Sequence, residues 1–169
     1  MAVATGPGSF TGLRIGVTTA KTFAYAVGCQ AIGVHTLASI ASRVAFGIRQ
    51  FVVVLDAHRG ELFVADFTRG AGDELSGSET TRVMRLEDWL PTLVPGCVVT
   101  GPGLIKVGDR LPEGVIALDP GLSLATAATV GQVGWRTFSA GRRESVFDLL
   151  PQYFRRTAAE EQWDRKQLG

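Results

Sequence analysis

Short apolar runs and longer helix-like segments alternate along the chain. Apolar runs bounded by Gly, Pro, Ser or Asp are typical of buried strands, whereas segments that start at a capping residue and stop at glycine are typical of helices. Strands that alternate with helices indicate an α/β protein. The predicted strands cover residues 2–4, 30–34, 51–56, 61–67, 82–84, 98–100 and 115–118, and the predicted helices cover residues 10–27, 37–46, 86–93 and 123–139.

The segments between these elements carry turn chemistry. His58-Arg59-Gly60 joins two predicted strands as a hairpin. Residues 69–78 are rich in Gly, Ser and acidic side chains, and we expect an exposed loop there. Gly-Pro-Gly occurs at residues 6–8 and again at 101–103, each time just after a predicted strand.

The first predicted helix has a regular row of small residues. Ser9 is a suitable N-cap for it and Gly28 a suitable stop. Small residues at every fourth position form a shallow groove in which another backbone can come close. A glycine inside a helix costs up to about 1 kcal/mol relative to alanine, so the row indicates close packing against this chain's own sheet or helices, or against a partner's helix. The row consists of Gly12, Gly16, Ala20, Ala24 and Gly28.

Composition narrows the classes of function. The 169 residues include 17 Lys and Arg against 16 Asp and Glu, which gives a net charge of +1. By itself such a chain is a poor nucleic-acid or membrane-surface binder, because both need a basic excess, but a place in a complex that acts on RNA stays open. Cys29 and Cys97 have no CxxC spacing and suit a reducing cytoplasm. Arg14 and Lys21 interrupt the longest apolar stretch, so we expect no membrane span.

Four segments spread over nearly the whole chain resemble one family. They are GPGSFTGLRIGVTTAKTFAYA, AIGVHTLASIA, LDAHRGELFVADF and PQYFRR. Together they are similar to the bacterial tRNA threonylcarbamoyladenosine biosynthesis proteins of the TsaB, or YeaZ, type, which belong to the sugar-kinase, actin and chaperone ATPase superfamily. The resemblance implies an α/β fold of two actin- or sugar-kinase-like (ribonuclease H-like) lobes.

The resemblance begins inside the first of these lobes. Family members start with a strand that carries an Asp-Thr-Ser-like turn, then further strands and a first helix, and none of these precedes Met1 in this sequence. We therefore expect residues 1–49 to be the remnant of an incomplete N-terminal lobe and residues 50–169 to be the C-terminal lobe. Since such a lobe has an unprotected sheet edge, we expect either a start upstream of Met1 or cover from another copy of the chain.

The resemblance implies a non-catalytic scaffold subunit. TsaB-type proteins pair with a catalytic paralogue, TsaD, which transfers a threonylcarbamoyl group to the adenosine next to the tRNA anticodon, and a small ATPase, TsaE, joins them. On this basis the chain needs no cofactor, reaches tRNA only through the complex, works in the cytoplasm and forms a homodimer without its partner. The first helix is expected to supply the partner surface through Phe10, Gly12, Leu13, Gly16, Val17, Ala20, Lys21 and Ala24.

The glycine-rich turn before this helix is a second candidate site. Backbone N–H groups at a helix N-terminus bind anions, but the turn lacks the lysine of a P-loop and the spacing of a dinucleotide fingerprint. A weak nucleotide or anion contact at a subunit interface stays open beside a purely structural turn. Its residues would be Gly6, Gly8, Ser9 and Thr11.

Metal and hydrolytic chemistry have little support. The catalytic paralogue carries a His-x-x-x-His pair, and the matching positions here are Thr36 and Ile40, so we expect no metal site. Ser9, His58 and Asp56 could be written as a triad, but no GxSxG elbow accompanies them. The alternatives to a scaffold are a peptidase-like or phosphotransferase enzyme of the same superfamily, or a protein whose role is self-association.

Overall fold

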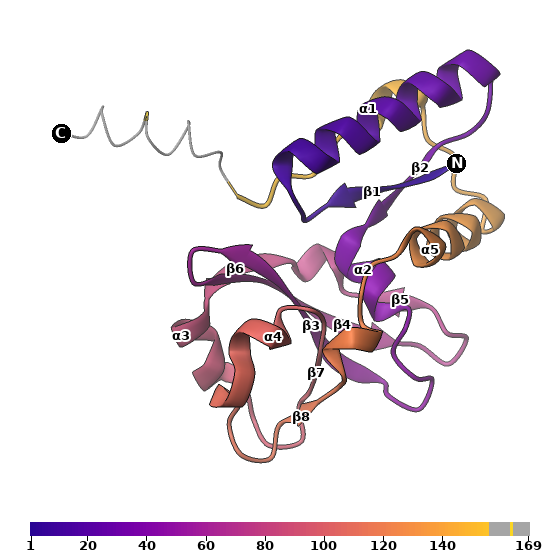
Figure 1. The fold of residues 1–169 in the computed structure, drawn as a ribbon. Helices are drawn as coiled ribbons and strands as arrows, with labels where there is room; N and C mark the ends of the chain where they lie inside the picture. The colour runs from indigo at the N-terminus through magenta and orange to yellow at the C-terminus, as the bar shows by residue number, and fades with distance from the viewer. Residues whose placement is uncertain (156–162, 164–169) are drawn as a thin grey trace.

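The chain folds around two separate sheets, one above the other in Figure 1. The computed structural model describes residues 1–155 and residue 163. The mixture of helices with parallel and antiparallel strands confirms the predicted α/β class. Among residues 1–155 and 163, no helix combines the length and apolar character that a membrane span requires.

The smaller sheet consists of two parallel strands, β1 (Ala2–Gly6) and β2 (Ile32–His35). Helix α1 (Phe10–Val27) packs on one face of it and helix α5 (Ala127–Ser139) on the other. Successive side chains of a strand point to opposite faces. Accordingly Val3 joins the cluster under α1, whereas Ala2 and Ala4 join the cluster under α5.

The larger sheet has the order β5-β4-β3-β7-β8, with β6 also paired to β4. The β3–β4 pair is the predicted hairpin, and β7 lies parallel to both β3 and β8. One face is covered by α2, and the other by α3 and α4. The strands are β3 (Gln50–His58), β4 (Glu61–Arg69), β5 (Leu75–Ser76), β6 (Arg82–Arg85), β7 (Val98–Thr100) and β8 (Ile116–Ala117), and the helices are α2 (Thr36–Ala41), α3 (Leu86–Trp89) and α4 (Leu104–Val107).

Short 3-10 turns complete the described part of the chain. The predicted helix 86–93 is split into α3 and such a turn, with Pro91 at the junction. The turns are η1 (Ser78–Thr80), η2 (Leu90–Thr92), η3 (Gly108–Arg110), η4 (Pro120–Leu122) and η5 (Val146–Asp148).

The prediction of an exposed loop at residues 69–78 is wrong at its start, and it also missed strand β5 and the buried Gly77. Arg69 ends β4 and is buried, with 3% of its surface exposed. Its Nη2 donates to the carbonyls of Ala41 (3.1 Å) and Val44 (2.8 Å), and Asp73 pairs with Nη1. These bonds also explain why the helix predicted for 37–46 ends at Ala41, since Arg69 binds the carbonyl oxygens beyond that point.

The helix predicted for 123–139 begins four residues later than expected, at Ala127. Thr126 caps it, because its hydroxyl accepts from the backbone N–H of Thr129 while the Thr129 hydroxyl accepts from the N–H of Thr126. Trp135 of this helix is exposed, and so is Leu124, which precedes the helix.

The division between residues 1–49 and 50–169 stays a prediction. The two sheets do separate near that point of the sequence. However, Val130 of α5 and Leu149, both from the second segment, pack in the cores of the smaller sheet. Parts of the segment 50–169 therefore pack with the smaller sheet as well as with the larger one.

Candidate functional site

Helix α1 is the first candidate, and its sequence forms it as expected. The hydroxyl of Ser9 accepts from the backbone N–H of Gly12 at 3.3 Å, and Gly28 ends the helix with a left-handed φ of 69°. Both bounds match the prediction, because each rests on a local capping signal.

One face of α1 belongs to this chain's own core. Four of the predicted partner residues lie there, and each has at most 8% of its surface exposed. Their burial removes them from any surface that a partner could reach on this chain. They are Leu13, Val17, Ala20 and Ala24.

A flank of α1 holds the C-terminal part of the chain. The ring of Phe10 packs on Tyr153 with centroids 4.6 Å apart, and Nε of Arg14 donates to the Tyr153 hydroxyl at 3.2 Å. Further along, Nζ of Lys21 donates to the carbonyl of Phe147 at 3.0 Å. Two more predicted partner residues, Phe10 and Lys21, therefore have contacts within the chain.

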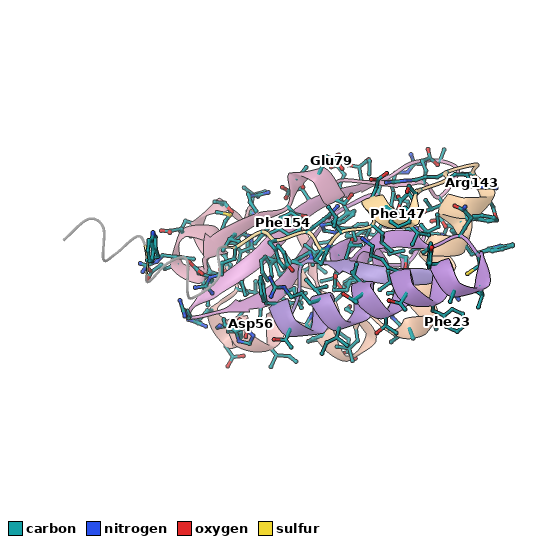
Figure 2. All side chains as sticks on the ribbon, turned by 90° about the horizontal axis from the view of Figure 1, so that it is seen from above. Phe23, Asp56, Glu79, Arg143, Phe147 and Phe154 are labelled. Carbon is teal, nitrogen blue, oxygen red and sulfur yellow. The ribbon has the colours of Figure 1, made fainter. Side chains whose placement is uncertain are left out.

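The remaining surface, which we call the outer face of α1, carries no ionisable side chain. Its large apolar members Ile15, Phe23 and Val27 are 63%, 54% and 57% exposed, and Phe23 lies near the end of the helix in Figure 2. The face also includes the predicted residues Gly12 and Gly16. Its full membership is Thr11, Gly12, Ile15, Gly16, Thr18, Thr19, Thr22, Phe23, Ala26 and Val27.

The chain's own packing does not require glycine at positions 12 and 16. A Cβ on Gly16 would lie 3.7 Å from Val3 Cγ2, an ordinary contact, and one on Gly12 would lie 3.4 Å from Ser9 Cβ. Gly134 of α5 is different, since its Cβ would lie 2.4 Å from Ala2 Cβ. Packing on the chain's own sheet thus accounts for Ala20 and Ala24 but leaves Gly12 and Gly16 unexplained.

The turn before α1 is the second candidate. It borders a cleft of about 690 Å³ whose other walls come from the β3–β4 hairpin and from residues 152–155. Of the predicted anion residues, Gly8, Ser9 and Thr11 line this cleft, whereas Gly6 is buried beside the C-terminal segment.

Charges of both signs line this cleft, because Arg59 and Arg155 lie in its walls together with Asp56. Asp56 stands at its wall, 2.6 Å from Nζ of Lys106. Burial raises the pKa of Asp56. Hydrogen bonds from Lys106 and from the backbone N–H of His58, together with the positive charges of these two residues, outweigh burial and leave the pKa below its usual value. The carboxylate is ionised at neutral pH, and the ammonium group of Lys106 balances its charge. A nucleotide or anion contact at Gly6, Gly8, Ser9 and Thr11 stays a prediction.

The two histidines do not lie together. The ring of His35 is packed between Thr81, whose hydroxyl lies 3.2 Å from Nε2, and Phe154. Burial lowers its pKa to about 4, partly offset by the nearby carboxylate of Glu79. His58 is exposed on the hairpin turn, where it forms no triad with Ser9, whose hydroxyl caps α1. Nowhere in the described part of the chain do three His, Cys, Asp or Glu side chains gather closely enough to hold a metal ion.

Sequence reasoning missed the exposed apolar members of α1. Ile15 and Phe23 lie outside the row of small residues on which the prediction was based. Projecting the sequence onto a helix would have shown that they and the threonines share a charge-free face.

Comparisons with known proteins converge on one family. Residues 1–108 match the family model described as TsaD, tRNA N6-adenosine threonylcarbamoyltransferase. The chain is 29% identical over 165 residues to the tRNA threonylcarbamoyladenosine biosynthesis protein TsaB of Escherichia coli (strain K12), covering 94% of this chain and 71% of that protein. It is 27% identical to the TsaB protein of Bacillus subtilis (strain 168), covering 98% and 73%.

Solved structures show the same fold. YeaZ from Pseudomonas aeruginosa superposes with a TM-score of 0.73 at 24% identity, over 89% of this chain and 72% of that one. A second structure from that organism, of a protein described as similar to peptidase YeaZ, gives 0.73 at 26% identity, over 90% and 71%. The architecture is consistent with the predicted actin- or ribonuclease H-like fold.

Proposed function

The chain belongs to the family of TsaD, tRNA N6-adenosine threonylcarbamoyltransferase, as a TsaB/YeaZ-type member, and we propose that it is a non-catalytic subunit of the machinery that makes threonylcarbamoyladenosine in tRNA. In this proposal it holds a TsaD-type catalytic paralogue in its active arrangement, and a TsaE-type ATPase joins the pair. The chain reaches tRNA only through that complex, in the cytoplasm.

The outer face of α1 is the observation that carries this proposal. A helix on the surface of a protein usually shows charged or polar residues on its exposed side. This one instead exposes Ile15, Phe23 and Val27 among threonines and glycines, with no charge. An exposed apolar patch of this kind marks an interface.

The glycines indicate what kind of partner fits. Gly12 and Gly16 stand one turn apart and both have room for a Cβ within this chain. Because glycine destabilises a helix interior, its presence there fits a site where a second backbone approaches closely. We infer that a helix of the paralogue crosses α1 at this point, with Ile15 and Phe23 packed beside the crossing.

Three features favour a scaffold over an enzyme. Thr36 and Ile40 occupy the positions at which the resemblance places the metal-binding histidines of the catalytic paralogue. The hydroxyl of Ser9 is engaged as a helix cap. The carboxylate of Asp56 is engaged by Lys106.

Calorimetric titration with the TsaD-type paralogue from the same source tests the proposal. We expect Gly16→Leu to weaken binding at least tenfold, because the side chain would hold the two helices apart. Gly131→Leu is the matched control, since Gly131 lies on α5 with nothing within 4 Å of its Cβ position. Circular dichroism checks that both variants keep their fold.

Comparing the affinities of the two variants with that of the parent chain distinguishes the possible explanations. Loss of affinity in Gly16→Leu alone supports the proposal. Equal affinity of the two variants and the parent chain removes the outer face of α1 from the interface. A homodimer that the paralogue cannot displace supports the alternative, that self-association is the role of the chain.

A further inference from the structure

Residues 151–155, which we call the C-terminal strap, run from the smaller sheet to the larger one. Just before the strap, Leu149 is buried under α1 with Val17 and Ala24. Near its end, Phe154 packs against the core of the larger sheet. Figure 2 shows Phe147 beside α1 and Phe154 further along, toward the strands. The strap thus passes from one core to the other.

The first anchors of the strap lie at the turn between β1 and α1. The backbone N–H of Gln152 donates to the carbonyl of Thr5 at 2.7 Å. A Cβ on Gly6 would lie 2.4 Å from the carbonyl oxygen of Gln152, so the strap can take this path only over a glycine. The ring of Tyr153 then rests on Phe10.

The second anchors lie on the β3–β4 hairpin. The ring of Phe154 meets Phe63 edge-on, with centroids 6.4 Å apart, and it meets His35 in the same way at 5.4 Å. Beyond it, Nη1 of Arg155 donates to the carbonyl of Ala57 at 2.9 Å. Over five residues the strap therefore touches β1, α1, β2 and the hairpin.

Two further connections join the sheets, one from β8 through η4 into α5 and one through α2. Strand β2 leads directly into this helix, and Leu37, Ile40 and Ala41 of α2 are part of the core of the larger sheet. This connection is continuous in the chain and well buried. The strap has shallower anchors, and Tyr153 is still 45% exposed.

We propose that the strap is a latch that gates the cleft beside the start of α1. While it is seated, it forms one wall of the 690 Å³ cleft and fixes the hairpin against the first turn. When it lifts, the cleft opens, with Phe10 and Phe63 on its walls. Helix α2, and the segment that runs from β8 into α5, still join the two sheets. Lifting frees only a few residues and breaks few contacts, so it is a local opening that leaves both cores folded.

The latch is independent of the proposed partner surface. Its contacts on α1 are Phe10 and Arg14, on the flank of the helix. Ile15 and Phe23 of the outer face lie further along the helix, and Thr11 is the member of that face that borders the cleft. Partner binding and latch opening can therefore be measured separately.

A pair of truncations tests the latch by hydrogen exchange. One chain ends at Leu150 and lacks the strap, and the other ends at Arg155 and keeps it. We expect exchange at residues 57–63 and 5–10 to be at least tenfold faster in the shorter chain than in the longer one. Equal exchange in the two truncated chains would overturn the proposal.

Point variants in the full chain cover the case in which the shorter truncation does not fold. Phe154→Ala removes the central anchor, while Leu150→Ala changes a side chain that is 62% exposed just before the strap. The latch predicts faster exchange at the hairpin in Phe154→Ala only, with the circular dichroism of both variants unchanged. Exchange at the parent rate in Phe154→Ala contradicts it.

Discussion

The two Thr-Gly-Pro-Gly turns, residues 5–8 and 100–103, have the same sequence and the same place between a strand and a helix. In both turns the threonine is buried, and the first glycine has a positive φ, 132° at Gly6 and 111° at Gly101. Glycine adopts such a φ without the strain that other residues suffer. The two turns share this glycine conformation, although the Gly6–Pro7 peptide bond is cis and the bond between Gly101 and Pro102 is not.

The turns differ in what lies against them. A Cβ on Gly101 would lie 2.2 Å from the carbonyl oxygen of Val54, in the middle strand of the larger sheet. A Cβ on Gly6 would lie 2.4 Å from that of Gln152, in the strap. One turn thus packs on a fixed strand and the other on a segment that we propose can lift. The same four residues therefore meet different neighbours in the two halves of the chain.

Alanine at the two glycines gives the largest expected effect. We expect Gly101→Ala to cost more than about 3 kcal/mol of unfolding free energy, because the backbone of β3 cannot move aside. Gly6→Ala should cost about 1–2 kcal/mol, the strain of the backbone conformation, since the strap can give way. Urea denaturation of both variants measures the difference. Equal losses would mean that the strap is held as firmly as β3.

Acid should lower the free energy of unfolding through His35, whose ring packs against Phe154 near the first turn. Burial lowers the folded-state pKa of His35 from 6.5 to about 4, so the unfolded chain takes up a proton at a higher pH than the folded chain. The contribution of neutral His35 to the unfolding free energy is fully present above pH 6.5. It is lost as the pH falls toward 4, by up to roughly 3 kcal/mol. Unfolding of the parent chain and of His35→Asn, compared at pH 7 and pH 4.5, measures this. A variant that keeps the whole pH slope would contradict the assignment.

The helices that follow the two turns start differently. Helix α1 has the side-chain cap from Ser9, whereas α4 has none. We expect Ser9→Ala to lower the unfolding free energy by about 1 kcal/mol. Thermal unfolding followed by circular dichroism at 222 nm measures this loss, which should lower the midpoint temperature by on the order of a few degrees. An unchanged midpoint would show that packing alone fixes the start of α1.

Glycine inside α1 gives the smallest effect, and in the opposite direction. Gly16→Ala should stabilise the isolated chain by about 0.5–1 kcal/mol, since its Cβ has room and alanine favours a helix. Gly134→Ala in α5 is the contrasting control, because its Cβ would collide with Ala2. Destabilisation of both variants would mean that the chain's own packing needs Gly16 after all.

Local signals in the sequence predicted much of the fold. Helix α1 starts and ends where predicted because Ser9 and Gly28 are capping residues in the sequence itself. The hairpin at 58–60 was predicted for the same kind of reason, from a turn between two apolar runs. Such features depend on neighbours in the chain and can be read without tertiary structure.

Features that depend on distant residues were not predictable in this way. The burial of Arg69, which ends the neighbouring helix early, rests on carbonyls more than 20 residues away in the sequence. The seat of the strap rests on Gly6, which the sequence suggested only as a turn residue. In the candidate site, the row of small residues pointed to α1, whose role as partner surface stays a prediction, and half of the residues named for it face the chain's own core.

The central claim is that the chain forms a complex with a TsaD-type paralogue. Size exclusion with light scattering, on the chain alone and mixed with that paralogue from the same source, tests it most directly. The account predicts one peak with the mass of a 1:1 complex, formed at the expense of any homodimer. A folded chain that elutes at its own mass, separate from the paralogue, would contradict it.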